Sequence, residues 1–532
     1  MIGRRALLAG AAFAAPALPG APPALAQRLP PPVPAAPPGP LSVRPDDWVA
    51  PAHGRQVLIR WGDRVTFDAP PWDPRNPTED AAAAQFGWDG RLAGLAVPPL
   101  GAEGIPRLVL AVVHPQVDPA MAWPGGRDRP AVAAAMQGAS LLNLEKAGHG
   151  WVVVDGGFQS RRLGANTLCR WTGPAAAAPG VVGVLGLEGG CATPWGSLLL
   201  TEGEPFTWLN RLGGLDARWQ DSRRFGWVVE LDPFDPQSVP AKRSALGRIG
   251  AVAVAATRAA DGRAVVFMAD GRGMGFLYRF VSARPAEEPD ALDAGTLYVA
   301  RAPGDAQGGA EGGSLHWVAL PPDSAADPAR AAESAGATPF DTPSALALDQ
   351  DGRRLVLACR AGVSRQASQV DGLNPHPSPH PGHVIELIGD PTAPRMEARL
   401  LFDAGVAPGS PDMPRYPATL TVDGRSRLWI GTDRAGRPGA AADAVFVCEL
   451  DGPARGVPRP AYAAPRAAGI GGAATTPGED AALVLVRTPG AEPGASFDRP
   501  ATRWPAFEAR TPPRTALVAL TRQGAGGGAV FG

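Results

Sequence analysis

The residues best suited to metal chemistry are three histidines in one short segment, His376, His380 and His383, with prolines between them. Imidazole nitrogens are common ligands of transition metals. The prolines prevent helix formation, so the histidines cannot share a helical face as an i, i+4 metal-binding pair does. His383 leads into an apolar run, which favours a structural role at the start of a strand. The sequence favours an ordinary loop here, and a metal site is the alternative.

Motifs of other common active sites are missing from the sequence. It contains no Walker loop, no GxSxG elbow and no GxGxxG fingerprint in a supporting context. Its formal net charge is −1, from 50 Lys and Arg residues against 51 Asp and Glu residues. A nucleic-acid-binding protein usually carries a basic excess. Nucleic acid is therefore not an expected partner. A small-molecule phosphate ester or another small ligand is left open as a partner.

The elements that must position any site are short apolar runs separated by Gly, Asp and Pro. Such runs, rich in Val, Leu and aromatic residues, are typical of β-strands. Helical periodicity is scarce, and the short helix expected at residues 131–136 would be opened by Pro130. The predicted fold class is all-β. The expected strands include residues 57–61, 108–113, 141–144, 151–155, 198–201, 227–231, 265–268 and 297–300.

A weak repeat connects pairs of these strands. An Asp-Gly turn between two apolar runs occurs at Asp261, Asp351 and Asp423, and Pro477-Gly478 has a similar setting. The intervals are irregular, roughly 55 to 90 residues, as expected when repeats carry loop insertions. Radial repeats that pack only on their neighbours let one all-β domain reach this length. The sequence predicts a β-propeller with loop insertions, and a two-sheet sandwich is the alternative.

The N-terminus has the layout of a twin-arginine export signal. Arg4 and Arg5 precede a short apolar run, and small residues at 24–26 fit a cleavage site. Pro16 and Pro19 break the run, which disfavours a membrane anchor. We expect a periplasmic or secreted protein that leaves the membrane after signal cleavage.

Three segments follow from this layout. Residues 1–26 are the predicted signal peptide, residues 27–50 a proline-rich linker, and residues 51–532 the folded domain. The four cysteines, at 169, 191, 359 and 448, form no CxxC or framework spacing. Three complete pairings are open to them in an oxidising compartment, and buried free thiols are favoured over any of these.

Segments spread over residues 55–520 match those of a known family and follow the same order. The clearest matching segments are residues 60–63, 172–176, 193–197, 224–236, 245–248, 295–300, 336–339, 427–430 and 503–505. In these segments the sequence resembles the PhoX alkaline-phosphatase family. The resemblance implies a six-bladed propeller whose central face holds calcium and iron for phosphomonoester hydrolysis.

The departures from the family fall where the resemblance implies metal ligands. The family's cysteine ligand aligns with Glu188, and its Cys-Glu-Glu run becomes Thr201-Glu202-Gly203. One carboxylate of its Gly-Asp-Asp run survives as Asp270. By this resemblance Glu188, Glu202 and Asp270 are the candidate ligands of a reduced metal site. The alternative is that they are ordinary strand-end acids.

Three further ligand runs also depart from the family. The family's His-Glu becomes Ala251-Val252, and its Pro-Asp-Asn becomes Pro417-Ala418-Thr419. Its Asp-Arg-Pro-Glu run becomes Asp341-Thr342-Pro343-Ser344, which keeps the aspartate and loses the glutamate. Calcium prefers six to eight oxygen ligands, largely carboxylates. We therefore expect calcium and iron to be reduced or absent.

The resemblance also implies three candidate contacts to the substrate. Arg161 and Arg162 align with an Asn-Arg-Arg run of the family, and His376 replaces an arginine that follows Asn-Pro. Arginine pairs suit anions such as phosphate, although an exposed pair more often forms surface salt bridges.

Three functions remain open at this point. The first is an exported, PhoX-like, metal-dependent phosphomonoesterase with an eroded metal centre and little or no activity. The second is a non-catalytic propeller, a pseudoenzyme that binds a ligand or a protein. The third is a lactonase-like hydrolase that uses a single calcium.

Overall fold

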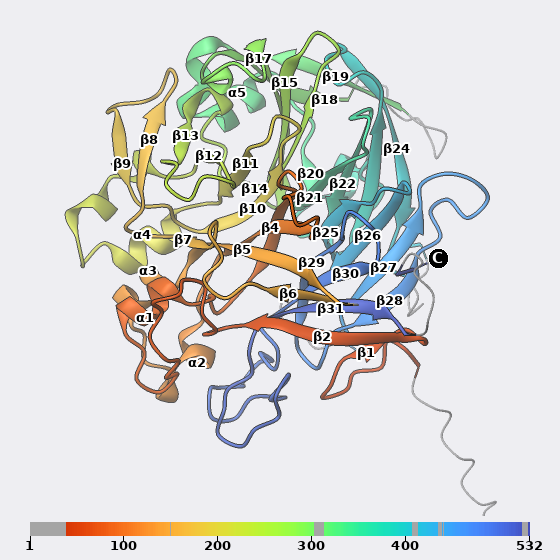
Figure 1. Ribbon diagram of the computed structural model, residues 1–532. Coiled ribbons are helices and arrows are strands. Elements are labelled where there is room, and N and C mark those ends of the chain that lie inside the picture. The colour runs from red at the N-terminus through yellow and green to blue at the C-terminus, as the bar shows by residue number, and fades with distance from the viewer. Residues whose placement is uncertain are drawn as a thin grey trace, which may run out of the picture. The chain divides into compact units, whose positions relative to one another are not determined.

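Antiparallel sheets are the main regular structure in the computed structural model of the chain (Figure 1). The structure describes residues 39–148, 150–302, 313–406, 413–434, 439, 441–523 and 530–531. The predicted signal peptide, residues 1–26, and the first part of the predicted linker, residues 27–38, lie outside the described residues. All the elements below belong to the unit Gly39–Gly532.

Six strands contact one another in a closed ring. Each of them is the end strand of an antiparallel sheet path, so we interpret each as the innermost strand of one propeller blade. The fold is therefore the all-β propeller that the sequence predicts. The ring strands are β3 (Arg91–Ala96), β10 (Leu187–Ala192), β14 (Ala251–Arg258), β21 (Pro343–Leu348), β25 (Pro417–Val422) and β29 (Gly469–Thr475).

The other strands extend these paths outward. Beyond β3 lie β4 (Arg107–His114), β5 (Gly138–Ala147), β6 (Gly150–Val153) and β7 (Arg161–Leu163). Beyond β10 lie β11 (Leu198–Glu202), β12 (Val228–Leu231), β13 (Ala241–Arg243), β8 (Leu168–Thr172) and β9 (Gly180–Val182). Beyond β14 lie β15 (Arg263–Asp270), β17 (Leu277–Pro285), β18 (Gly295–Arg301) and β19 (Gly313–Ala319).

The remaining three paths follow the same pattern. Beyond β21 lie β22 (Arg354–Cys359), β23 (His383–Ile388) and β24 (Arg395–Asp403), and β24 pairs with β19. Beyond β25 lie β26 (Arg427–Thr432), β27 (Ala444–Glu449), β28 (Arg459–Ala463) and β1 (Trp48–Val49). Beyond β29 lie β30 (Ala481–Arg487), β31 (Ala516–Arg522) and β2 (His53–Arg60). Two short strands, β16 (Met274–Gly275) and β20 (Phe340–Asp341), pair separately.

The repeated turns connect innermost strands to their neighbours. Asp261-Gly262 joins β14 to β15, Asp351-Gly352 joins β21 to β22, and Asp423-Gly424 joins β25 to β26. Gly262 has φ of +85° and Gly352 has φ of +67°, conformations that a residue with a Cβ adopts only with strain. The weak repeat in the sequence therefore marks one recurring turn of the propeller.

Helices are few and short among the described residues. Pro130 occupies the first position of α3, so the helix predicted at residues 131–136 is confirmed. The α-helices are α1 (Glu79–Ala84), α2 (Pro119–Ala122), α3 (Pro130–Met136), α4 (Phe206–Leu212) and α5 (Pro328–Ser334). The 3-10 turns are η1 (Pro124–Gly126), η2 (Ala217–Gln220), η3 (Ser222–Arg224), η4 (Ser244–Leu246), η5 (Ala291–Asp293), η6 (Pro322–Ala326) and η7 (Ala367–Gln369). None of these helices is long and apolar enough to cross a membrane.

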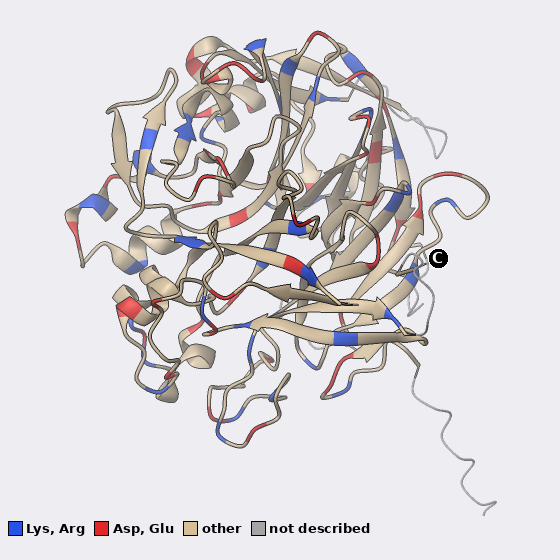
Figure 2. Cartoon of the chain, viewed as in Figure 1, with Lys and Arg blue, Asp and Glu red and all other residues tan. Residues whose placement is uncertain are grey.

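The core lies between neighbouring blades. Val265 and Phe267 of β15 share one buried cluster with Leu355 and Leu357 of β22. Alternating side chains of each strand thus fill the space between adjacent sheets, as propeller packing requires. Charged residues of both signs are interspersed over the strands and loops (Figure 2).

The packed unit includes part of the segment predicted as a linker. Leu41 is buried with 5% of its surface exposed, and Trp48 and Val49 pair with Ala463 and Tyr462 of β28. Apolar side chains within the proline-rich stretch provide this packing, so the ordered domain begins before residue 51. The cysteines at 169, 191, 359 and 448 are all free thiols in the structure.

Candidate functional site

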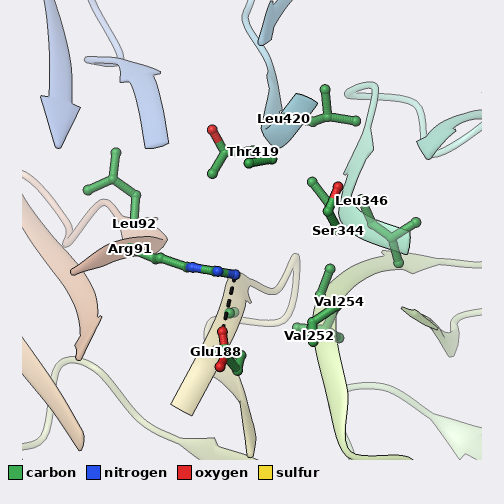
Figure 3. A pocket seen from close by; sticks show the side chains of 14 residues that line it. Arg91, Leu92, Glu188, Val252, Val254, Ser344, Leu346, Thr419 and Leu420 are labelled. Carbon is green, nitrogen blue, oxygen red and sulfur yellow. Dashed lines mark ion pairs between the residues drawn. The ribbon is translucent and has the colours of Figure 1, made fainter. Parts of the chain in front are cut away.

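Five of the six ring strands line a small pocket on the propeller axis (Figure 3). Its volume is about 60 Å³, and it shares lining residues with a larger cavity of about 610 Å³ that follows the inner strands. The small pocket is lined by Arg91, Leu92, Glu188, Gly189, Gly190, Val252, Ala253, Val254, Ser344, Ala345, Leu346, Ala418, Thr419 and Leu420.

Glu188 is the one carboxylate in this lining. Its Oε2 lies 3.2 Å from Nη1 of Arg91, and the ion pair spans the pocket between β3 and β10 (Figure 3). Both side chains are partly buried, with 15% of Arg91 and 29% of Glu188 exposed. The charge of this carboxylate is therefore already balanced by a guanidinium group.

Several of the positions at which the resemblance implies metal ligands lie in the lining of this pocket. Val252, Ser344 and Ala418 line it together with Glu188. The hydroxyl group of Ser344 donates to the backbone oxygens of Ala358 and Pro417. The site that would gather carboxylates from several inner strands is thus lined by one carboxylate, hydroxyl groups and aliphatic side chains.

Glu202 lies outside the pocket lining and is fully engaged elsewhere. Its Oε1 accepts hydrogen bonds from Lys242 Nζ at 2.7 Å and from the Leu185 backbone N–H at 3.0 Å. Its Oε2 accepts from the backbone N–H groups of Gly226 and Trp227. Neither Glu202 nor Lys242 is exposed to solvent. Glu202 is a buried structural acid that joins β11 to the surrounding loops.

Asp270 is also satisfied by its own neighbourhood. Its Oδ1 accepts from the Arg272 backbone N–H at 3.0 Å, and its Oδ2 accepts from Arg272 Nε at 2.6 Å. Among the described residues, Glu188, Glu202 and Asp270 do not form a group whose ligand atoms lie within 4.8 Å of one another. The structure therefore does not bring these three candidate ligands together.

The arginine pair expected to meet substrate is bound by backbone instead. Arg161 donates from Nη1 to the carbonyl oxygens of Pro236 and Ser238 at 2.8 and 2.9 Å. Arg162 donates from Nη2 to three carbonyl oxygens, those of residues 135, 136 and 137, and from Nη1 to Ser140 Oγ. Burial without a carboxylate partner lowers the pKa of Arg162 to about 9.

His376, the third candidate substrate contact, pairs with an acid outside the central pocket. Its Nε2 lies 2.5 Å from Oδ2 of Asp403, and 35% of its side chain is exposed. His376 therefore lies at the surface of the blade that contains β23 and β24.

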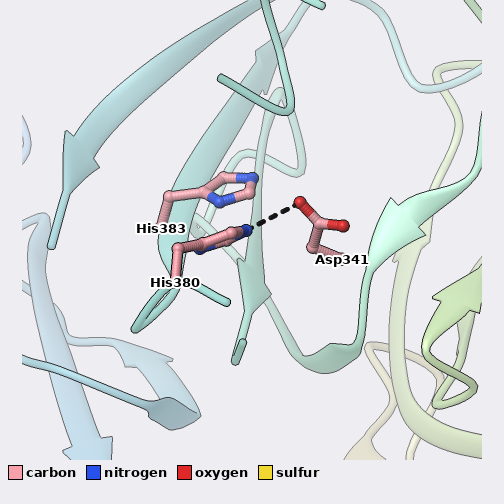
Figure 4. Close-up of side chains that lie close together, drawn as sticks. All are labelled: Asp341, His380 and His383. Atoms are coloured by element: carbon pink, nitrogen blue, oxygen red, sulfur yellow. Dashed lines mark hydrogen bonds and ion pairs between the residues drawn. The ribbon is translucent and has the colours of Figure 1, made fainter. Parts of the chain in front are cut away.

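The histidine segment forms a cluster that the sequence did not predict (Figure 4). Asp341, His380 and His383 are the one group of three among the described residues whose ligand atoms all lie within 4.8 Å of one another. His380 Nε2 lies 2.9 Å from Asp341 Oδ2. Burial, reinforced by neighbouring His380, lowers the pKa of His383 to about 4. Since Asp341 precedes His380 by 39 residues, the spacing gave no signal of this contact.

A second buried group of charges connects two blades. Arg487 Nε donates to Asp89 Oδ1 at 2.9 Å, and its Nη1 donates to Asp433 Oδ2 at 2.7 Å. Asp443 accepts hydrogen bonds from the Thr432 hydroxyl and the Arg434 backbone N–H. Burial, with the charge of Asp433 beside it, raises the pKa of Asp443 to about 7.

Solved structures with the same architecture include one close in fold. The structure of Pseudomonas fluorescens PhoX in complex with vanadate, a transition state analogue, aligns with a TM-score of 0.81 and 26% identity over 92% of this chain and 98% of that chain. A gluconolactonase from Xanthomonas campestris (11% identity, TM-score 0.29, 92% and 98% of the two chains) superposes too poorly to support an argument. The same holds for a 6-phosphogluconolactonase-like protein from Bacteroides uniformis (13%, 0.24, 51% and 76%).

A search of curated proteins found no significant match. The sequence profile of the family described as Alkaline phosphatase PhoX matches residues 38–490. This range includes all six ring strands and ends before β31. The chain therefore belongs to the PhoX alkaline phosphatase family.

Proposed function

We propose that this chain is a PhoX-family protein with a reduced metal centre, whose metal-dependent phosphomonoesterase activity is weak or absent. The lining of the central pocket carries the proposal. Val252, Ser344 and Ala418 occupy positions that the resemblance assigns to charged or amide ligands, and Glu188 is ion-paired to Arg91.

Calcium and iron fit this lining poorly. Calcium takes six to eight oxygen ligands, and its affinity follows the number of charged ligands. One carboxylate cannot neutralise several adjacent cations, and here its charge is offset by Arg91. Phosphoryl transfer depends on cations that neutralise charge developing on the phosphate. A site without them lacks the main source of rate enhancement for this reaction.

The same pocket suits a small ligand, which could be a phosphate ester or another small molecule. Arg91 offers a guanidinium group, and the Thr419 hydroxyl is buried with no hydrogen-bond partner among the described residues. The adjoining cavity of about 610 Å³ gives room for such a molecule along the axis. In this form of the proposal the protein binds a small ligand without turning it over, and it is a pseudoenzyme.

A lactonase-like hydrolase with one calcium is less well supported. Such a site also needs several oxygen ligands around the cation. Glu188 is the one carboxylate of the small pocket, and the only metal-ligand cluster of the described residues contains two histidines.

In the same proposal the chain is exported through the twin-arginine pathway to the periplasm or beyond. The support is the sequence alone, with Arg4 and Arg5 ahead of the apolar run. Replacing both by lysine should abolish export of the mature chain. Unchanged export of that double variant would exclude the twin-arginine pathway.

Elemental analysis and turnover together test the proposed activity. The exported protein should contain less than one iron per chain, and it should hydrolyse p-nitrophenyl phosphate at least 10 to 100-fold more slowly than Pseudomonas fluorescens PhoX with calcium and iron added. Zinc is measured separately, because the histidine cluster could bind it without phosphatase activity.

One result would overturn the proposal. Stoichiometric iron together with several calcium ions, and robust turnover that is lost in Glu188→Gln, would restore an active phosphatase. Glu188 is the informative position because it lines the pocket, whereas Glu202 variants would test folding.

A further inference from the structure

Three buried side chains converge at one end of the β21–β24 blade (Figure 4). Asp341 is the last residue of β20, and His383 is the first residue of β23. His380 pairs with Gly362 in an isolated β-bridge. Asp341 and His383 are fully buried, and His380 is almost fully buried. Strand pairing therefore fixes the three groups on a rigid part of the fold, as a binding site requires.

The ring of His383 distinguishes this cluster from a group of buried side chains that only stabilise the fold. Neither of its ring nitrogens has a hydrogen-bond partner among the described residues. A buried polar group without a partner is costly, and each case calls for an explanation such as a bound water or ion. The His383 ring lies near that of His380, with centroids 5.5 Å apart and planes tilted by 34°, and it is drawn beside the Asp341 carboxylate in Figure 4. Its free nitrogens are thus available to a non-protein partner.

The carboxylate is held so that one oxygen faces the histidines. Arg365 Nε donates to Asp341 Oδ1 at 2.9 Å, and its other nitrogens donate to the carbonyl oxygens of Gln369 and Pro339. This leaves Asp341 Oδ2 on the His380 side, 2.9 Å from Nε2. Groups that orient ligands in this way are typical of metal sites.

The local charge favours a cation. Asp341 and Asp403 supply two negative charges and Arg365 one positive charge, and Asp403 lies opposite His383 in the β23–β24 ladder. The cluster lies close to a partly exposed side chain. His376 is 35% exposed, and its ring centroid lies 6.0 Å from that of His380.

We propose that Asp341, His380 and His383 bind one divalent transition-metal cation of the zinc type. Two imidazoles and one carboxylate are a preferred ligand set of zinc, with a fourth position left for water. The oxygen-rich set that calcium prefers is absent from this cluster.

Binding changes the tautomer of His380. In the metal-free protein His380 Nδ1 accepts from the Gly382 backbone N–H, so Nε2 carries the proton that it donates to Asp341. Coordination through Nε2 moves this proton to Nδ1, and no proton is released. The hydrogen bonds to Gly382 and Asp341 are lost, and bonds from the cation to Nε2 and to the Asp341 carboxylate replace them. The proposal does not rest on the phosphatase question, because none of the three residues lines the central pocket.

Zinc titration of the mature, chelator-treated chain tests the site. Wild type should bind one zinc per chain, and His383→Ala should weaken that binding by more than about 10-fold. The matched control is His316→Ala, because His316 lies on β19 outside the cluster. It should bind zinc as the wild type does. Equal affinity in His383→Ala and wild type, or no zinc binding by wild type, would overturn the proposal.

The visible absorption spectrum of bound cobalt tests the site in the wild-type protein, without a variant. Cobalt bound to wild type should show the visible bands of a four-coordinate site with nitrogen ligands, and zinc should displace it. Asp341→Asn keeps the shape of the side chain and should weaken these bands. Octahedral cobalt spectra in wild type, as for loosely bound surface ions, would contradict the assignment.

Discussion

Lys242 Nζ lies 2.7 Å from Glu202 Oε1, and neither side chain is exposed. The ammonium group also donates to the Arg224 backbone oxygen at 2.8 Å and lies over the ring of Phe225. A fully buried pair of this kind is strongly destabilised when one partner is removed, because the other charge is left uncompensated.

Lys242→Met should therefore lower the free energy of unfolding by about 3 to 5 kcal/mol, measured by urea denaturation. Lys146 is the only other lysine, and its pair with Asp480 is partly exposed, so Lys146→Met should cost less than about 1 kcal/mol. Equal losses in the two variants would show that burial of the pair does not matter.

Returning carboxylates to the central pocket should restore cation binding. The double variant Val252→Glu/Ser344→Glu places two acids beside Glu188, and its calcium affinity should rise at least about 10-fold above wild type in calorimetric titration. Val252→Gln/Ser344→Gln has the same shape without charge and is the control. Calcium binding that rises equally in both would exclude a charge effect.

Asp443 should make stability depend on pH. Its pKa is raised from 3.8 to about 7 in the folded protein, so its favourable contribution is complete below pH 3.8 and is lost as pH rises through about 7. Asp443→Asn mimics the protonated form and should be more stable than wild type at pH 8. The difference should vanish near pH 4, as followed by chemical denaturation. A constant difference across this range would contradict the raised pKa.

Arg162 should matter for stability and not for ligand binding. Arg162→Leu leaves three backbone oxygens and Ser140 without their donor, which should cost about 2 to 4 kcal/mol. Arg127→Leu, at an exposed arginine, should change stability by less than about 0.5 kcal/mol. Ligand affinity that falls in Arg162→Leu at unchanged stability would reinstate the predicted substrate contact.

Much of the fold follows from the sequence because its signals are local. The Asp-Gly turns and the proline that opens α3 act within a few residues, and each is found where the sequence predicts it. The linker boundary was less well predicted. Leu41 shares a buried cluster with Ala345 and residues further along the chain, and Trp48 pairs with Ala463, so no local pattern reveals these contacts.

The candidate site was only partly predictable. Glu188 reaches the pocket, but Glu202 points to Lys242, a partner 40 residues away. Which face of a strand an acid occupies depends on register, and a shift of one residue reverses it. Asp341 and His380 lie 39 residues apart in the sequence and meet only in the folded blade, so the cluster could not be predicted from the proline-separated histidines alone.

The pairing of β2 with β31 has a consequence for biogenesis. Strand β2 finds its neighbour only when residues 516–522 have been synthesised. Until then β2 and β30 both lack the strand that lies between them, and their unpaired edges are prone to association with other chains. Such a chain is best folded before it crosses a membrane, which agrees with the proposed twin-arginine export, since that pathway moves proteins after folding.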